Sequence, residues 1–273
     1  GCGAGAGLAA VYNVPLGGAV FALEVLILRL DPRSILMALA SSCIAAMLAW
    51  SVLGDVPQYH IPDFTLSAPL LVLCVLAAPI IGLAGHGFAR LTAAARKHMR
   101  TDARLIRRCL AVFTLIGLAA MAFPQLPGNG KGPIQLGLES ALPLHLTLAL
   151  LGLKLAAIAG ALWAGAEGGV LTPGLTVGAL LSTLLVLGWN MVLPAVPAGA
   201  FALVGAAAFL GVSMEMPFTA VALMFGFTRV GQDFLVPLIL TAALASATSR
   251  AVPLVQAALA NRRAPAPEGE TAI

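Results

Sequence analysis

The residues best suited to chemistry lie in the stretch GAEGGVLTPGLTVGALL, residues 165–181. Gly165, Gly168 and Gly169 permit backbone turns that other residues resist, and an apolar helix is predicted directly after them. The first N–H groups of a helix have no partner within it and lie at its positive end. Within a membrane, such a helix start can bind an anion without a fixed cation. Close packing of the glycines is the alternative explanation.

Few other polar residues suggest chemistry. For Glu24, an interfacial position or an ion pair with Arg29 is favoured over a proton or gating role. Lys154 is costly inside a membrane, so it either raises the local potential for anions or binds a structural partner such as a helix C-terminus. Glu215 is expected to be an acid at the start of the helix that Pro217 opens. The sequence has no nucleophile–base pair, phosphate loop, metal-ligand spacing or redox motif, so no enzyme activity, cofactor or metal is predicted.

The composition places these residues in a membrane. Hydrophobic residues make up 60% of the 273 and charged residues 10%, with a mean hydropathy of +1.00. Soluble domains have about 45–50% apolar and about 25% charged residues. The apolar runs are long and unbroken, which favours helices over the alternating strands of a β-barrel. The 29 glycines and 18 prolines predict an all-α membrane protein with short, tilted and broken helices around an internal site.

Charged residues predict the orientation. Arg29 and Arg33 follow the first apolar segment, and seven basic residues lie between positions 90 and 108. Both links are therefore expected to be cytoplasmic, and the loops near 55–63 and 128–132 to face the other side. The basic cluster is interpreted as a determinant of topology beside membrane lipid, and no nucleic-acid partner is expected. Apolar segments are predicted at 14–28, 34–54, 68–88, 104–123, 142–164, 170–194, 198–212, 217–228 and 234–249.

One internal repeat is visible. GLAAVYNVPLGGAVFAL at 7–23 is similar to GAAAFLGVSMEMPFTAVALMF at 205–225. Each copy has a start rich in small residues, a loop, and a proline that opens a short apolar helix, where its missing N–H has little cost. Repeats of this kind are typical of transporters whose two halves enclose a site near the middle of the membrane.

The stretch GAEGGVLTP resembles the glycine-rich segment that opens an anion-coordinating helix in the CLC family of chloride channels and proton–chloride antiporters. GLAAVYNVPLGGAVFALEV, GNGKGPIQ and MPFTAVALMFGFT resemble further family segments in the same order, and the resemblance covers about residues 3–260. It implies two antiparallel repeats of short tilted helices, one anion pore per subunit and a homodimer.

The resemblance also implies a division of the chain. Residues 1–55 would end the first inverted repeat, with a helix pair and the following helix, and 56–67 would be an extracytoplasmic loop. Residues 68–260 would form the second repeat, with the anion-site helix at 169–190, and 261–273 a disordered cytoplasmic tail. The chain starts with Gly1, and the serine-containing anion loop and gating-glutamate motif of the family do not occur in it. It is therefore interpreted as the C-terminal part of a longer protein, inactive alone, of a bacterial-type inner membrane.

The resemblance also implies roles for individual residues of the site. Backbone amides at Gly169, Val170 and Leu171 are expected to coordinate the anion, and the resemblance implies this for Val170 and Leu171, since the family uses backbone groups at the positions matching these two. Glu167 stands where the family usually has proline or serine. For Glu167, a capping or partner-facing role is favoured over a proton relay.

Two substitutions bear on coupling. Val25 stands where antiporters of the family carry an inner glutamate, and channel-type members show a similar valine. Val255 stands where the family has a tyrosine that reaches the anion, which implies a looser inner gate. The expected function is transmembrane transport of chloride or another anion, either channel-like or weakly coupled. A secondary transporter that couples another solute to an ion gradient through Glu167 or Lys154 is one alternative, and an inactive membrane remnant is another.

Overall fold

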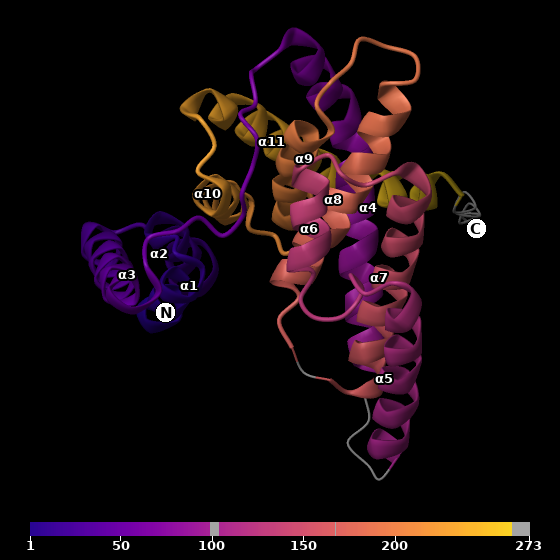
Figure 1. Cartoon of the computed structure of the whole chain (residues 1–273), viewed down its shortest axis with the longest axis horizontal. Helices are drawn as coiled ribbons and strands as arrows, with labels where there is room; N and C mark the ends of the chain where they lie inside the picture. The colour runs from indigo at the N-terminus through magenta and orange to yellow at the C-terminus, as the bar shows by residue number, and fades with distance from the viewer. Residues whose placement is uncertain (99–103, 167, 264–273) are drawn as a thin grey trace, which may run out of the picture.

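The computed structural model describes residues 1–98, 104–166 and 168–263, and these residues form helices and their connections without a β-strand. Figure 1 shows the first three helices gathered on one side, joined to the larger helical body through a long non-helical connection. The helices are α1 (Cys2–Tyr12), α2 (Pro15–Phe21) with π-helical η1 (Ala22–Ile27), α3 (Pro32–Leu53), α4 (Ala68–Lys97), α5 (Arg104–Ala122), α6 (Lys131–Leu138), α7 (Leu144–Ala164), α8 (Leu171–Trp189), α9 (Ala198–Ser213), α10 (Pro217–Thr228), 3₁₀-helical η2 (Gln232–Phe234) and α11 (Leu235–Arg263).

Among the described residues, six helices are long and apolar enough to cross a membrane, namely α3, α4, α5, α7, α8 and α11. Four apolar helical segments are shorter: α1, α2 with η1, α9 and α10. This mixture confirms the prediction of an all-α protein with short helices. Apolarity alone did not predict α1 or α6, because helices of 11 and 8 residues are shorter than the segments that a membrane-length criterion finds.

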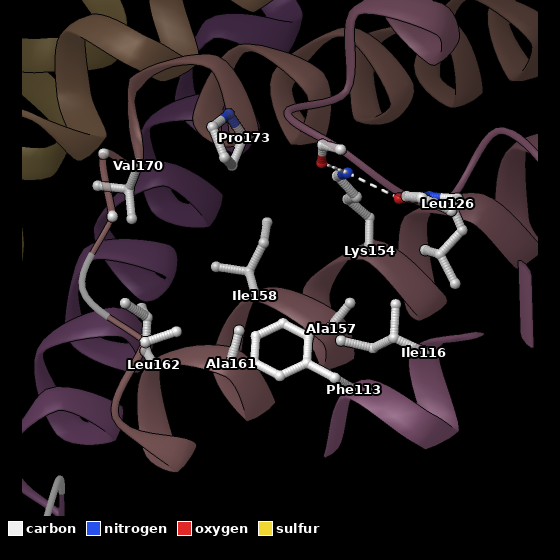
Figure 2. A pocket seen from close by; sticks show the side chains of 15 residues that line it. Phe113, Ile116, Leu126, Lys154, Ala157, Ile158, Ala161, Leu162, Val170 and Pro173 are labelled. Carbon is white, nitrogen blue, oxygen red and sulfur yellow. Dashed lines mark hydrogen bonds between the residues drawn. The ribbon is translucent and has the colours of Figure 1, made fainter. Parts of the chain in front are cut away.

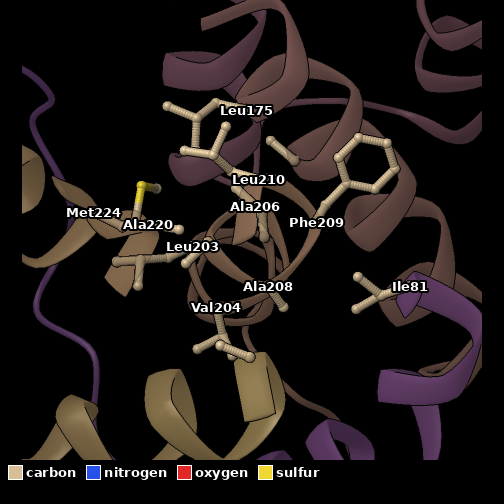
Figure 3. Close-up of a cluster of buried hydrophobic side chains, with 14 of the residues drawn as sticks. Ile81, Leu175, Leu203, Val204, Ala206, Ala208, Phe209, Leu210, Ala220 and Met224 are labelled. Atoms are coloured by element: carbon tan, nitrogen blue, oxygen red, sulfur yellow. The ribbon is translucent and has the colours of Figure 1, made fainter. Parts of the chain in front are cut away.

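The centre of the fold is α9. Every residue from Gly199 to Ser213 is buried, as expected for a helix that is hydrophobic on all sides. Its neighbours are α4, α6, α8, α10 and α11. In Figure 3, α9 side chains such as Leu203 and Phe209 project in different directions toward these surrounding helices. The helix that carries the predicted anion site, α8, therefore packs directly on the rigid core of the molecule.

The outer helices expose apolar surface. In α5, none of the most apolar 18-residue stretch is buried, and Leu110, Leu118 and Met121 are exposed. In α3, Met37 and Leu48 are exposed in the same way. Exposed apolar surface of this extent is compatible with lipid as the surrounding solvent.

The segment α2–η1 and helix α10 run antiparallel to each other. In η1, toward the end of the segment α2–η1, Glu24 accepts hydrogen bonds from the backbone N–H groups of Phe218 and Thr219 at the start of α10. At the other end of α10, Arg229 pairs with Asp55, which also binds the turn before α2. Because the end of one segment meets the start of the other, α2–η1 and α10 have opposite directions. The inverted-repeat architecture is confirmed.

The C-terminal boundary differs from the prediction. The last span was expected at 234–249 and the tail at 261–273, but α11 continues to Arg263. Its final residues, ALANRR, include five good helix formers (Ala, Leu and Arg) and one weaker one, Asn261, so the helix continues beyond the apolar span. The remainder of the predicted tail, 264–273, lies outside the described residues. The connection 54–67 is non-helical.

Candidate functional site

A cavity of about 360 Å³ lies between α5, α7 and the start of α8. Figure 2 shows it from close by, with Val170 on one side and Lys154 on the other. Five residues of the glycine-rich segment 165–181 line it, Ala166, Gly168, Gly169, Val170 and Pro173. The other lining side chains are mainly apolar and include Phe113, Ile116, Ala157, Ile158, Ala161 and Leu162.

The glycine-rich segment begins with a helix end. Gly165 has a left-handed backbone with φ of 101°, which favours glycine, and it terminates α7. The N–H of Gly165 donates to the carbonyl of Leu162 at 3.1 Å, and the N–H of Ala166 donates to that of Ala161 at 3.0 Å. These bonds satisfy the last carbonyls of α7 and turn the chain away from its axis. Gly165 therefore shapes the loop and does not itself line the cavity.

Gly168 and Gly169 have a different reason to be glycine. Neither has a positive φ, and a Cβ atom at either position would meet no atom within 4 Å. Packing therefore does not require glycine here, which argues against the close-packing alternative. Among the described residues, the N–H groups of Gly169, Val170 and Leu171 have no backbone acceptor. Of these three residues, Gly169 and Val170 line the cavity and Leu171 does not.

Lys154 brings the cavity its only described ammonium group. The residue is 4% exposed, and its Nζ donates to the carbonyls of Leu126 and Gly128, each at 2.9 Å. These carbonyls belong to the loop after α5, so Lys154 has the structural partner that was one of its two expected roles. An ammonium has three donors, and two of them have protein acceptors in this structure. Its positive charge still acts on the cavity that it lines.

Two contacts beside the start of α8 were not predicted. The Tyr12 hydroxyl at the end of α1 shares a hydrogen bond of 3.1 Å with the hydroxyl of Thr172. At the end of α4, the Arg96 guanidinium donates to the carbonyl of Gly168 at 3.2 Å. Both contacts join residues that lie far apart in the sequence, and only the basic cluster that contains Arg96 gave any sequence signal.

The two glutamates near the start of α10 make contacts that the sequence did not suggest. Glu24 does not pair with Arg29; its carboxylate accepts from the N–H of Phe218 at 3.2 Å and of Thr219 at 2.6 Å. The start of α10 thus attracts the carboxylate that the dipole argument assigned to Glu215. Glu215 instead occupies the left-handed turn before α10, with φ of 56°, and makes no capping bond.

The remaining predicted site residues are dispersed. Leu171 is the first residue of α8 and Val170 its N-cap, one or two residues after the predicted start. Val25 lies on η1 and is 36% exposed, and Val255 lies on α11 and is 56% exposed. Neither valine lines the cavity. Glu167 lies outside the described residues.

Comparison with known proteins gives consistent results. A family model described as voltage gated chloride channel matches residues 1–250. A putative chloride channel protein ClcB-like of Ralstonia nicotianae is 31% identical over 256 residues, which are 92% of this chain and 59% of that protein. The H(+)/Cl(-) exchange transporter ClcA of Cronobacter sakazakii is 27% identical over 250 residues, 88% of this chain and 53% of that protein. The chain thus spans little more than half the length of these relatives.

Solved structures share the fold. A slow cyanobacterial Cl-/H+ antiporter superposes with a TM-score of 0.83 at 19% identity, covering 96% of this chain and 65% of the other. A CLC-type fluoride/proton antiporter superposes with a TM-score of 0.72 at 21% identity, covering 91% of this chain and 62% of the other. The family model, the short antiparallel helices and the apolar spans agree: the chain belongs to the voltage-gated chloride channel (CLC) family of multi-pass integral membrane proteins.

Proposed function

We propose that the intact protein moves chloride or a similar small anion passively across a membrane, with the start of α8 as part of its anion site. One observation carries this proposal: the N–H groups of Gly169, Val170 and Leu171 lack backbone acceptors beside a cavity, where neither packing nor φ requires glycine. The names of the relatives, a chloride channel and a chloride exchanger, support chloride as the substrate.

The chemistry of the cavity suits a transported anion. Backbone amides at a helix start attract an anion through partial charges, and they have no full charge that would hold it permanently. Lys154 adds a full positive charge, but two carbonyl oxygens already bind its ammonium. An anion that enters the cavity is therefore attracted by Lys154 and coordinated by the amides, and it is free to leave.

The second part of the proposal is that transport is passive, without coupling to protons. A proton-coupled carrier needs an ionisable group that binds a proton within the pathway. The position that holds a glutamate in antiporters of the family is Val25 here, and a valine side chain binds no proton. Glu24, the acid beside it, already binds the start of α10. We also expect the intact protein to be a homodimer in a bacterial-type inner membrane, as the resemblance to the family implies.

A halide-flux assay tests the anion site. The intact protein is reconstituted in liposomes, and flux is compared between the wild type, Gly169→Val and Gly152→Val. Gly152 is a matched control, because it lies on α7 with open space around it and does not line the cavity. Gly169→Val should reduce chloride flux about tenfold by covering the amides, which corresponds to losing one charge-assisted hydrogen bond.

The outcomes are distinct. Absence of anion-dependent flux in the wild type would refute the proposed function. Equal flux in Gly169→Val and the wild type would refute the position of the anion at the start of α8. Coupling is measured separately: if an outward chloride gradient drives protons uphill into the liposomes, transport is coupled and the passive mechanism is wrong.

A further inference from the structure

Arg96 holds the glycine-rich segment from outside the cavity. It lies in the last turn of α4, and its guanidinium donates to the carbonyl of Gly168 at 3.2 Å, across 72 positions of sequence. Arg96 itself is exposed and does not line the cavity, whereas Gly168 does. We infer that Arg96 is a positioning residue of the anion site, which sets the direction of the Gly169 amide. The inference rests on the proposed anion transport.

One peptide bond, between Gly168 and Gly169, links the contact with Arg96 to the amide of Gly169. The carbonyl of Gly168 and the N–H of Gly169 belong to one planar peptide unit, and in a trans peptide they point in opposite directions. Holding the oxygen toward Arg96 therefore directs the N–H of Gly169 away from Arg96. A peptide between two glycines rotates easily because neither has a Cβ atom. Without the guanidinium, this unit is free to turn, and the N–H loses its fixed direction.

The same contact strengthens the amide as a donor. A hydrogen bond from a charged donor polarises the carbonyl that accepts it, and hydrogen-bonded groups in series reinforce one another. The peptide unit thus transmits part of the positive charge of Arg96 to the N–H of Gly169. The full charge stays outside the cavity, so an anion is bound more tightly without direct contact with a guanidinium.

The neighbouring cations have other positions. Arg108 donates to the carbonyl of His98 at 3.2 Å, and its guanidinium lies 4.2 Å from the centre of the Trp163 ring. Lys97 follows Arg96 and is exposed, and within the described part of the chain it makes no hydrogen bond to the segment 168–170. Lys97 therefore carries the same charge as Arg96 at the next position of α4 but makes no contact with Gly168, so it is a matched control.

The test compares Arg96→Ala, Arg96→Lys and Lys97→Ala in the intact protein in liposomes, with chloride as the probe. Flux is measured over a range of chloride concentrations, and thermal unfolding is recorded for each variant. Arg96→Ala should raise the chloride concentration at half-maximal flux about tenfold, as expected for losing a charged hydrogen bond. Lys97→Ala should change it much less, and Arg96→Lys should restore part of the affinity.

Each outcome decides between explanations. Equal shifts in Arg96→Ala and Lys97→Ala would show that only the net charge of the cytoplasmic loop matters, and would overturn the inference. A lower melting temperature with unchanged half-maximal concentration would assign Arg96 a purely structural role and would also overturn it. If the wild type transports no anion, the proposed function fails first, so that failure is distinguishable from the failure of this inference.

Discussion

The α1–α2 turn and the α9–α10 turn have nearly the same backbone in different surroundings. Each copy of the turn contains one residue with a left-handed backbone. In the first copy it is Asn13, directly after α1, with φ of 57°; in the second it is Glu215, two residues after the end of α9, with φ of 56°. The next residue has φ of −133° in both copies, with ψ of 74° at Val14 and 64° at Met216. A proline then starts each second helix, as the repeat in the sequence predicted.

The surroundings of the two copies differ strongly. In α1, only Gly5 and Ala9 are buried, whereas α9 is buried from Gly199 to Ser213. The turn is thus determined locally, by small residues, a left-handed residue and a proline. The degree of burial depends on the helices that surround each copy. Similar local sequence therefore does not imply similar sensitivity to substitution.

The second difference is that the second helix of the first copy, α2 with η1, is one residue longer than α10. The seven residues of α2 and the six of η1 correspond to twelve in α10. A π-helical turn is the usual way for a helix to accommodate one extra residue, and such turns are frequent at functional sites. Here the π turn contains Glu24, whose carboxylate binds the start of the other copy. The insertion thus coincides with the contact that links the two copies.

The largest expected effect tests the difference in burial. Gly3 and Gly205 occupy corresponding positions of the repeat, but a Cβ atom at Gly205 would lie 2.6 Å from the Cβ of Ser182, and one at Gly3 would meet nothing within 4 Å. Gly205→Val should destabilise the protein by about 1–3 kcal/mol through overpacking. Gly3→Val should change stability by about 0.5 kcal/mol or less. Thermal unfolding in detergent measures both, and equal losses would contradict the comparison.

A smaller effect tests the link through the π turn. Glu24→Gln retains one acceptor oxygen and removes the charge at the start of α10, which should cost about 1 kcal/mol. Glu215→Gln is the matched control, because Glu215 is nearer to α10 in sequence but makes no capping bond to it. Chemical denaturation of both variants measures the difference. A greater loss in Glu215→Gln would show that the link is not made by Glu24.

The smallest effect tests the opposite end of the same pair of helices. In the exposed loop after α3, hydrogen bonds from Asn13 and then Arg229 hold the pKa of Asp55 below its usual 3.8. Because the folded-state pKa is lowered, its stabilisation is present above pH 3.8 and is lost as the pH falls through the lowered value. Asp55→Asn should therefore reduce the melting temperature slightly at neutral pH and have no effect in strong acid.

The control for that prediction is Asp63→Asn in the same loop, for which no hydrogen bond or ion pair occurs within the described residues. Salt should weaken the effect of Asp55, since exposed ion pairs are screened. A pH-independent loss in Asp55→Asn would contradict an electrostatic contact.

Much of the fold was predictable because its signals are local. The apolar runs, the prolines at helix starts and the repeat identified most membrane segments, and the start of α8 fell within two residues of its expected position. The glycines at 168 and 169 were identified as candidates for amide access, but the sequence could not separate that reason from close packing. Only the open space around both glycines distinguishes the two explanations.

The contacts that complete the site could not be predicted, because each one joins distant positions. The bond between Arg96 and Gly168 spans 72 residues, and the bond between Tyr12 and Thr172 spans 160. Periodicity describes which face of a helix is buried, but it does not say which helix lies opposite. The same limit explains why the contact of Glu24 was not predicted, since its partner Thr219 is 195 residues away.

The complete burial of α9 has a consequence for biosynthesis. Its 16 residues extend about 24 Å, less than the roughly 30 Å of a hydrocarbon core. Two of the helices that cover it, α4 and α8, are synthesised earlier, but α10 and α11 are synthesised later. During membrane insertion α9 therefore lacks the cover of α10 and α11 until the end of the chain arrives. Closure of the core depends on α11, so a ribosome that stops before position 235 releases a chain whose central helix is still uncovered.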